Sequence, residues 1–392
     1  MLNTDFADWP LYTQEECDSV VSVLKSNRVN YWTGEKCRRF EEQYAEFAQS
    51  KYAISLSNGT VAIELALRAL DIGEGDEVIV TPRSYVASVT PVFTVGASPI
   101  FADIDLNSQN ISADTIAEKI SNKTKAIIVV HLAGHPAEMD EIVTLAKKNN
   151  IRIIEDCAQA HGAQYKGKPV GKSGDIAAWS FCQDKIITTG GEGGMVTTDN
   201  EQYWKSMWAY KDHGKSLDAV MEPRKKENEF RWLHESVGSN YRMSEMQAAI
   251  GIIQLGRMQS WHKKRLDNAN AIWSACSETR WLEIPKVPNY AEHAAYKAYA
   301  FIDFEALPSE WNRSQIIDEF VKRRVPVSSG GCPEIYKEKL FENTQSVPKA
   351  PLVNADKLGK TSLMFLVHPT LTEKQVAITC DAIKEIDKII FE

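Results

Sequence analysis

The segment between residues 151 and 195 holds the side chains with the clearest capacity for chemistry. Lys185 lies five residues after Ser180, beyond the end of a short apolar run, and four glycines follow it between residues 190 and 194. A lysine amine whose charge is suppressed in a desolvated pocket can attack a carbonyl group and form a Schiff base. Glycines allow the backbone to pass close to a bound ring. An exposed lysine in a glycine-rich hairpin is the alternative that this pattern leaves open.

Two acidic residues and a glutamine follow the apolar run that begins this segment. Glu155 and Asp156 come directly after residues 151–154, and Gln159 lies three residues further on. Ligands of open α/β sheets bind outside the carboxyl ends of the strands. A carboxylate in that place can pair with the pyridine nitrogen of pyridoxal phosphate and keep the ring an electron sink. Capping of the next helix by the acidic pair is the alternative.

A phosphate-binding turn is predicted at residues 58–60. Asn58, Gly59 and Thr60 begin a helical pattern directly after an apolar run, where free amides and the helix dipole attract anions. Ser180 could donate a further hydrogen bond to the same phosphate. Tyr85, which follows another apolar run, could lie against a cofactor ring. An ordinary helix cap and a packing tyrosine are the alternatives.

The elements that must position these side chains alternate along the chain. Seven short apolar runs read as buried strands, and amphipathic stretches at residues 61–70 and 138–149 read as helices between them. This alternation predicts an α/β fold with a mostly parallel sheet covered by helices on both faces. The seven predicted strands span residues 52–57, 78–80, 100–104, 126–130, 151–154, 176–181 and 194–198.

A second, smaller α/β domain is predicted at the C-terminal end. Residues 244–265 form one long helical pattern that begins with a capping box between Ser244 and Gln247. Beyond it the pattern changes, so we expect a large domain over residues 1–255 and a small one over residues 256–392. The elements predicted in the small domain are strands at 299–304 and 364–368 and helices at 314–324 and 373–390.

The bulk composition excludes several classes of protein. The net charge of −8 disfavours nucleic acid and anionic membranes as main partners. The seven cysteines are scattered without a CxxC pair, so neither a metal cluster nor a disulfide framework is indicated. No apolar run reaches the roughly 20 residues that span a bilayer. We therefore expect a cytoplasmic protein without a metal.

The motifs, taken in order, resemble one family. SNGTVAIELAL, GDEVIVTPRSYVAS, EDCAQAHGA, SFCQDK, GGEGGM and NYRMSEMQAAIG follow one another in the order seen in the nucleotide-sugar aminotransferases of the DegT/StrS group. These are fold-type I pyridoxal phosphate enzymes, so the resemblance implies that fold, with a seven-stranded sheet in the large domain. The segment VPVSSGGCPEIY departs from the common pattern of the family.

The resemblance also implies roles for individual residues. Lys185 would bind the cofactor covalently and then transfer protons, and Asn240 would reach the phosphate of the neighbouring subunit in a homodimer with shared active sites. Trp32 and His213 would lie near the sugar, whereas His161 would be structural. The other cofactor contacts implied are Asp156 to the pyridine nitrogen, Gln159 to the phenolic oxygen, Gly59, Thr60 and Ser180 to the phosphate, and Tyr85 to the ring face.

The activity expected from the resemblance is transfer of an amino group from glutamate to a keto sugar linked to a nucleotide. The preferred substrate is a UDP-linked 4-keto-6-deoxy-N-acetylhexosamine, aminated at C-4 for a bacterial surface polysaccharide such as O-antigen. A GDP- or dTDP-linked sugar and a 3-keto sugar are alternatives. A sugar dehydratase is disfavoured because family dehydratases replace the Schiff-base lysine with histidine. A non-catalytic sensor is disfavoured because the catalytic set is intact.

Overall fold

A seven-stranded sheet forms the centre of the larger part of the molecule in the computed structural model, which describes residues 6–223 and 230–392. Its strand order is β1-β9-β8-β5-β4-β2-β3. Only β9 runs antiparallel to its two neighbours, so the predicted, mostly parallel sheet is confirmed. The strands are β1 (Tyr52–Leu56), β2 (Glu77–Val80), β3 (Ser98–Phe101), β4 (Thr124–Val130), β5 (Arg152–Asp156), β8 (Ile176–Ser180) and β9 (Gly194–Thr198).

Helices cover both faces of this sheet, because alternate residues of its strands are apolar on each side. Ile54 and Val196 lie in the core shared with α3, whereas Ala53 and Met195 lie in a second core shared with α2 and α9. The helices of this part are α1 (Gln14–Lys25), α2 (Lys36–Phe47), α3 (Gly59–Ala69), α4 (Thr90–Thr94), α5 (Ala113–Ala117), α6 (Met139–Asn149), α7 (Glu201–Lys211), α8 (Leu217–Met221) and α9 (Glu245–Gly256).

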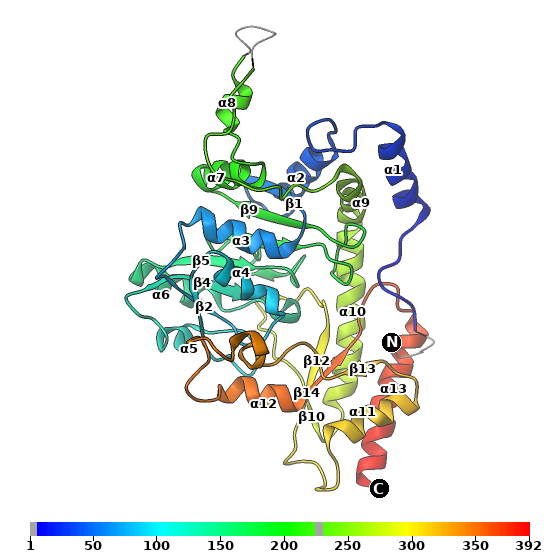
Figure 1. Cartoon of the computed structure of the whole chain (residues 1–392). Coiled ribbons are helices and arrows are strands. Elements are labelled where there is room, and N and C mark those ends of the chain that lie inside the picture. The colour runs from blue at the N-terminus through cyan, green and yellow to red at the C-terminus, as the bar shows by residue number, and fades with distance from the viewer. Residues whose placement is uncertain (1–5, 224–229) are drawn as a thin grey trace.

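The smaller part is built on a four-stranded antiparallel sheet of order β10-β12-β14-β13, below the large sheet in Figure 1. A separate apolar core joins this sheet to α10, α11 and α13. The elements are α10 (Met258–Ser277), β10 (Leu282–Glu283), β12 (Ala298–Ile302), α11 (Arg313–Lys322), β13 (Val327–Ser328), α12 (Val353–Thr361), β14 (Ser362–Phe365) and α13 (Glu373–Phe391).

The two parts share side chains across their junction. Tyr336, Phe341 and Leu358 belong to the core of the large sheet although they lie late in the sequence. The loop before α12 therefore packs under β3, where Phe341 contacts Phe101. The division at residues 255 and 256 remains a prediction.

The prediction of one long helix over residues 244–265 is wrong in one respect. Two helices occupy this stretch, because the chain departs from regular helix geometry at Arg257, after α9 ends at Gly256. Glycine is a poor helix former, and the Arg257 guanidinium binds Glu15 and Glu16 of α1. The predicted capping box at Ser244 and Gln247 is confirmed.

Some features had no signal in the periodicity. A three-stranded sheet joins β11 (Ala291–Glu292), β6 (Gln164–Tyr165) and β7 (Lys168–Pro169).

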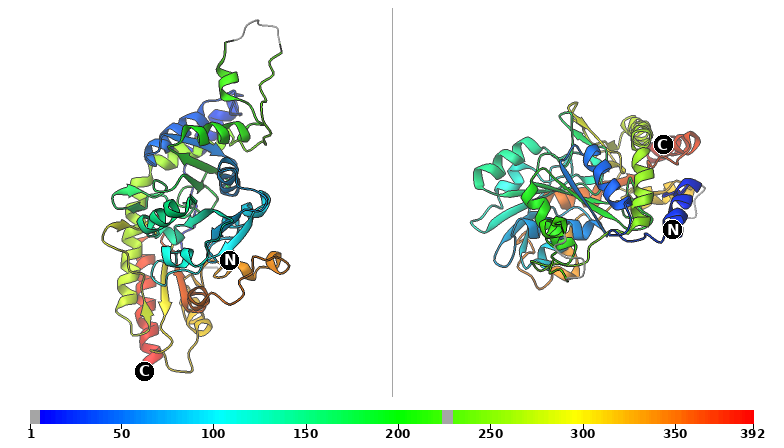
Figure 2. Two further views of the ribbon diagram at one scale, coloured as in Figure 1. Left: turned by 90° about the vertical axis from the view of Figure 1, so that its left-hand side faces the viewer. Right: turned by 90° about the horizontal axis from the view of Figure 1, so that it is seen from above.

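The segment with α8 projects beyond the body of the molecule (Figure 2). Within the described residues no helix is long and apolar enough to cross a membrane.

Candidate active site

A cavity of about 720 Å³ lies at the carboxyl ends of the parallel strands. That is the place where open α/β sheets bind ligands, and the volume falls in the range of cofactor and substrate sites. Seven of the ten residues predicted for the site line this one cavity: Gly59, Thr60, Tyr85, Asp156, Gln159, Ser180 and Lys185.

The turn at the start of α3 is shaped to admit a ligand close to its backbone. The Asn58 side chain caps the helix by accepting from the Val61 amide at 3.0 Å. A Cβ atom at Gly59 would lie 2.7 Å from the Ser180 Cβ, so only glycine fits there. The unpaired amides of the first turn attract an anion, and these residues fit a phosphate group.

Asp156, at the end of β5, is a buried carboxyl that reaches the cavity. It accepts hydrogen bonds from the Ser88 hydroxyl at 2.7 Å and the Ala158 amide at 3.1 Å. Burial raises the pKa of Asp156 above its ordinary value, against the lowering effect of the Ser88 hydrogen bond. A cation placed against this carboxyl would hold it ionised, as the protonated nitrogen of a pyridine ring does.

Gln159 presents a donor that suits a polar edge of a pyridine ring, and Tyr85 presents an aromatic ring that suits its face. The Gln159 carbonyl oxygen accepts from the Ala133 amide at 2.8 Å, which orients its NH₂ group as the remaining donor. Tyr85 is 69% exposed although it lines the cavity, so its ring is available to stack on a ligand.

Lys185 is held from two sides. Its Nζ lies 3.4 Å from the Tyr296 hydroxyl and 3.5 Å from an Asp184 carboxylate oxygen. Tyr296 in turn donates to Asp184. The Trp9 indole donates to the Lys185 carbonyl oxygen at 2.8 Å, which fixes the backbone of the loop. The amine therefore has a defined resting place at the edge of the cavity.

Trp32, His213 and Asn240 do not line the cavity of their own chain. They gather instead near the C-terminal end of α7. The Trp32 ring lies against Trp208, His213 donates its amide to Ser239, and residue 240 forms a bridge with residue 212. Their predicted contacts with sugar and with a neighbouring subunit's phosphate remain predictions.

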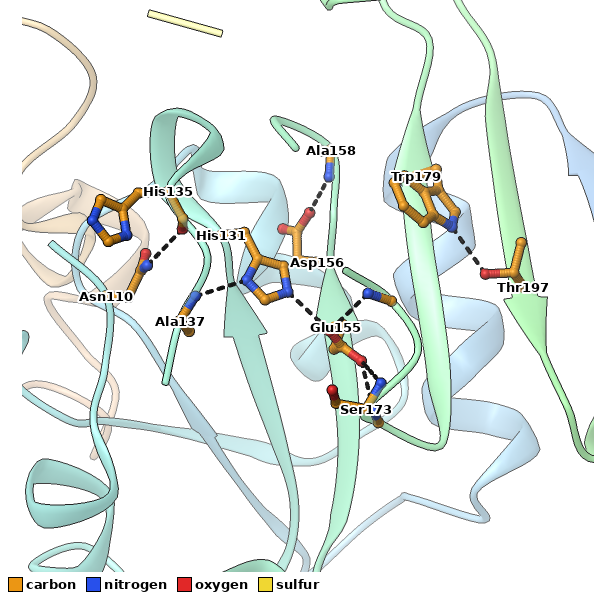
Figure 3. Close-up of polar contacts among 12 residues, drawn as sticks. Asn110, His131, His135, Ala137, Glu155, Asp156, Ala158, Ser173, Trp179 and Thr197 are labelled. Carbon is orange, nitrogen blue, oxygen red and sulfur yellow. Dashed lines mark hydrogen bonds and ion pairs between the residues drawn. The ribbon is translucent and has the colours of Figure 1, made fainter. Parts of the chain in front are cut away.

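The histidines closest to the site are structural. His131 donates from Nε2 to Glu155 at 3.0 Å and accepts at Nδ1 from the Ala137 amide, so both ring nitrogens are used (Figure 3). Glu155 also accepts from three backbone amides of residues 171–174. His131, Glu155 and Cys157 bring possible ligand atoms within 4.8 Å of one another, but the hydrogen bonds already satisfy the first two.

His161 is buried next to Ser180, at the end of β8. Its Nε2 donates to the Ser180 carbonyl at 2.9 Å and its Nδ1 accepts from the Tyr44 hydroxyl at 2.7 Å. Burial lowers the pKa of His161 to about 3, so the ring stays neutral. This geometry agrees with the structural role that was expected.

Several residues of the cavity had no signal in the sequence. Arg83, Lys297 and Tyr299 line it, as do Gly330, Gly331 and Cys332 from the segment that departs from the family pattern. Arg83 stands inside a motif that was recognised, and its charge in a run of small and apolar residues was the available clue. The others come from the smaller part of the molecule, and only the tertiary fold shows that they line the same cavity as Lys185.

The comparison with protein families decides the identity of this site. The model of the DegT/DnrJ/EryC1/StrS aminotransferase family matches residues 10–384. The chain belongs to this family. The GDP-perosamine synthase of Escherichia coli O157:H7 is 35% identical over 376 residues, which cover 96% of each chain. The dTDP-3-amino-3,6-dideoxy-alpha-D-galactopyranose transaminase of Aneurinibacillus thermoaerophilus is 37% identical over 282 residues, or 72% of this chain and 73% of that protein.

Solved structures agree with this assignment. An aminotransferase from Psychrobacter cryohalolentis is 53% identical and superposes with a TM-score of 0.97, covering 99% of this chain and 100% of that one. A sugar aminotransferase of Streptococcus pneumoniae, described as putative and solved in its pyridoxamine phosphate form, is 25% identical, with a TM-score of 0.88 and coverage of 99% and 100%. The protein is an aminotransferase, and pyridoxal phosphate is its cofactor.

Proposed function

We propose that this aminotransferase moves an amino group from glutamate to a keto sugar carried on a nucleotide. The observation that carries the proposal is the convergence of Lys185, Asp156, Gln159 and Ser180 on one cavity. The preferred acceptor is a UDP-linked 4-keto-6-deoxy-N-acetylhexosamine, aminated at C-4. Its product would serve a surface polysaccharide such as O-antigen, and the enzyme would act in the cytoplasm.

The residues of the cavity fit the cofactor in one orientation. Gly59, Thr60 and Ser180 would hold its phosphate, and Asp156 would hold the protonated pyridine nitrogen. Gln159 would donate to the phenolic oxygen, and Tyr85 would cover one face of the ring. When bound, pyridoxal phosphate draws electrons away from the carbon that bears the amine.

Lys185 supplies the proton transfers. Its Nζ takes a proton from the amine-bearing carbon of the donor and later delivers a proton to the sugar carbon. Tyr296 and Asp184 hold Nζ whenever it is not bound to the cofactor, because both already contact it. The role of these two side chains is to orient the amine.

The nucleotide-linked class of acceptor draws its support from the relatives. One is named for a GDP-linked and one for a dTDP-linked amino sugar. GDP- and dTDP-linked acceptors, and amination at C-3, are therefore the alternatives to the UDP-linked sugar. A dehydratase is the less favoured reaction because Lys185 is present.

A homodimer with shared sites is part of the proposal. Trp32, His213 and Asn240 lie together outside their own cavity, so a neighbouring subunit could receive them. In the projecting segment with α8, Phe230 and Trp232 are 77% and 86% exposed, and their ring centres lie 4.7 Å apart. Apolar side chains in a contiguous exposed group mark an interaction surface.

The test is a reaction of the cofactor-loaded protein with glutamate and a panel of UDP-, GDP- and dTDP-linked keto sugars, followed by mass spectrometry. An amino sugar from one member of the panel is expected. Lys185→Ala should lose at least about 10³-fold in turnover because the proton carrier is removed. Lys263→Ala, at an exposed lysine of α10, is the matched control and should retain full turnover. Normal turnover of Lys185→Ala would contradict the proposed mechanism.

A further inference from the structure

Arg83 is a buried cation without a counter-ion. Its side chain is 2% exposed and lines the cavity. Nε donates to Gln109 at 3.1 Å and Nη2 donates to the Ser362 hydroxyl at 2.7 Å, whereas Nη1 has no partner. Both partners are neutral, and no ion pair of Arg83 with a described carboxylate is present. A buried charge without a counter-ion destabilises the folded protein unless a ligand supplies the opposite charge.

Lys297 is a second cation that lines the same cavity, and the charge of the nearby Asp184 carboxylate acts on it. Lys297 lies just before β12, forms no ion pair with a described residue, and has its Nζ 5.1 Å from the centre of the Tyr296 ring. The Nζ of Lys185 lies at the same distance from that ring. Lys297 also lies close enough to Asp184 and Lys185 for the charges of both to act on it, which places it near the amine that carries out the chemistry. Burial lowers the pKa of Lys297 to about 8.

The predicted phosphate turn lies away from Arg83 in the strand order. The phosphate turn follows β1 and Ser180 ends β8, whereas Arg83 follows β2. In the strand order, β1 and β8 lie on one side of β5, which carries Asp156, and β2 lies on the other. Arg83 therefore follows a strand two places from β5, on the side away from the predicted phosphate turn. Another anion must meet it.

The chemistry of the two substrates indicates which anion this is. In an amino acid the reacting carbon bears a carboxylate directly. In a nucleotide-linked keto sugar the reacting carbon is separated from the nearest phosphate by the sugar ring. Both carbons must occupy the same place beside Lys185, so the bound amino acid brings its carboxylates into the cavity that Arg83 and Lys297 line.

We propose that Arg83 and Lys297 form a subsite that binds the carboxylate groups of the amino donor. The Arg83 guanidinium offers an unused N–H for a charge-assisted hydrogen bond, and Lys297 offers a mobile point charge. Tyr299, whose ring centre is 5.4 Å from the Arg83 Cζ, lines the same cavity. The subsite rests on the proposed function in taking glutamate as the donor.

The experiment separates donor from acceptor. Holoenzyme is titrated with glutamate, and its amine form with the nucleotide keto sugar, and each half-reaction is followed by the absorbance of the cofactor. Glutarate, a dicarboxylate without an amine, is titrated as a competitor of glutamate and gives an affinity that needs no turnover. The variants are Arg83→Gln, Lys297→Gln and the charge-retaining Lys297→Arg, with Lys263→Gln as the surface control.

We expect Arg83→Gln and Lys297→Gln to weaken glutamate and glutarate binding by about 10- to 100-fold, the loss of one charge-assisted hydrogen bond. Lys297→Arg and Lys263→Gln should stay within about 3-fold of the wild type, as should the sugar half-reaction of every variant. If Arg83→Gln does not fold, Lys297→Gln alone decides.

Three outcomes would overturn the subsite: unchanged glutarate affinity, an equal loss in both half-reactions, or a loss confined to the sugar half-reaction. The last would assign the two cations to the anionic part of the nucleotide sugar. Failure of the proposed function has a different signature, because wild-type protein would then react with glutamate and bind glutarate yet aminate none of the sugars. That result would leave the carboxylate subsite standing.

Discussion

At the scale of single residues, Asp156 shows how the site is prepared for a cation. The carboxyl is buried, is hydrogen-bonded to Ser88 and Ala158, and has its pKa raised by burial. In the protein without cofactor, the folded state therefore resists ionisation of Asp156 more than the unfolded chain does. A bound pyridinium would remove that penalty, so cofactor binding and the charge of Asp156 are linked.

We expect Asp156→Asn to stabilise the cofactor-free protein and to destabilise the loaded one relative to wild type. Below pH 3.8 the carboxyl is protonated in both states. As the pH rises through the raised pKa, the unfolded state ionises first, so wild-type apoprotein loses stability and the variant does not. Thermal unfolding between pH 4 and pH 8, with and without pyridoxal phosphate, measures both effects. Asp267→Asn, at an exposed carboxyl of α10, is the control, and an equal gain from cofactor in Asp156→Asn and wild type would refute the linkage.

At the scale of elements, the crossing of α2 and α9 is set by a single small residue. A Cβ atom at Gly251 of α9 would lie 2.6 Å from the Phe40 ring of α2. Phe40 is fully buried and also contacts Phe181, one residue past the end of β8 and close to the Lys185 loop. Close approach of the two helices therefore supports the strand that leads into the active site.

Gly251→Ala should lower the free energy of unfolding by about 1–3 kcal/mol, because overpacking against Phe40 outweighs the gain in helix propensity. Gly256→Ala, in the last turn of the same helix, meets nothing within 4 Å and should raise the stability by up to about 1 kcal/mol. Chemical denaturation of the two variants provides the comparison. Equal stabilities of the two would show that the α2–α9 contact is not tightly packed.

The elements that were predictable from sequence are those whose apolar pattern is local. All seven strands of the large sheet were expected, and so were β12, β14, α11 and α13, because each buries a continuous or periodic apolar face. The break at Arg257 was not, since it depends on ion pairs with Glu15 and Glu16, more than 240 residues away in sequence. The short strands β6, β7 and β11 carry too few residues to show a period.

The residues of the site also divide into those that the sequence predicted and those that it could not. Asp156, Gln159, Ser180 and Lys185 stand at strand ends within one contiguous segment, where local motifs indicated their chemistry. Arg83 and Lys297 could not be found in this manner. Their significance is the lack of an ion pair with any described residue, and an absent ion pair is a property of the three-dimensional structure.

At the scale of the whole molecule, three of the ten residues predicted for the active site do not line the cavity of their own chain. The three residues outside it, Trp32, His213 and Asn240, lie near the C-terminal end of α7, from which the α8 segment continues. The bridge between residues 212 and 240 places Asn240 at the base of that projection. A twofold dimer would let each projection reach the cavity of the other subunit, as isologous contacts require.

Light scattering should give twice the chain mass of 44.0 kDa, and mixed subunits should show shared sites. Lys185→Ala and Asn240→Asp are each expected to be inactive alone. Hybrid dimers of the two would hold one intact site, so an equal mixture should recover about a quarter of the wild-type activity. Recovery would not occur if Lys185 and Asn240 served the same chain's site.

The anchoring of Trp9 has a consequence for how the protein is made. Its indole supports the Lys185 loop, yet the ring itself rests on Trp261, Arg265 and His368, and the neighbouring Asp8 carbonyl accepts from Thr370. During translation, residues 8 and 9 leave the ribosome early and wait for partners as many as 362 positions later. Contacts of such sequence separation form late. The reactive lysine therefore acquires its full support only after residue 370 has emerged.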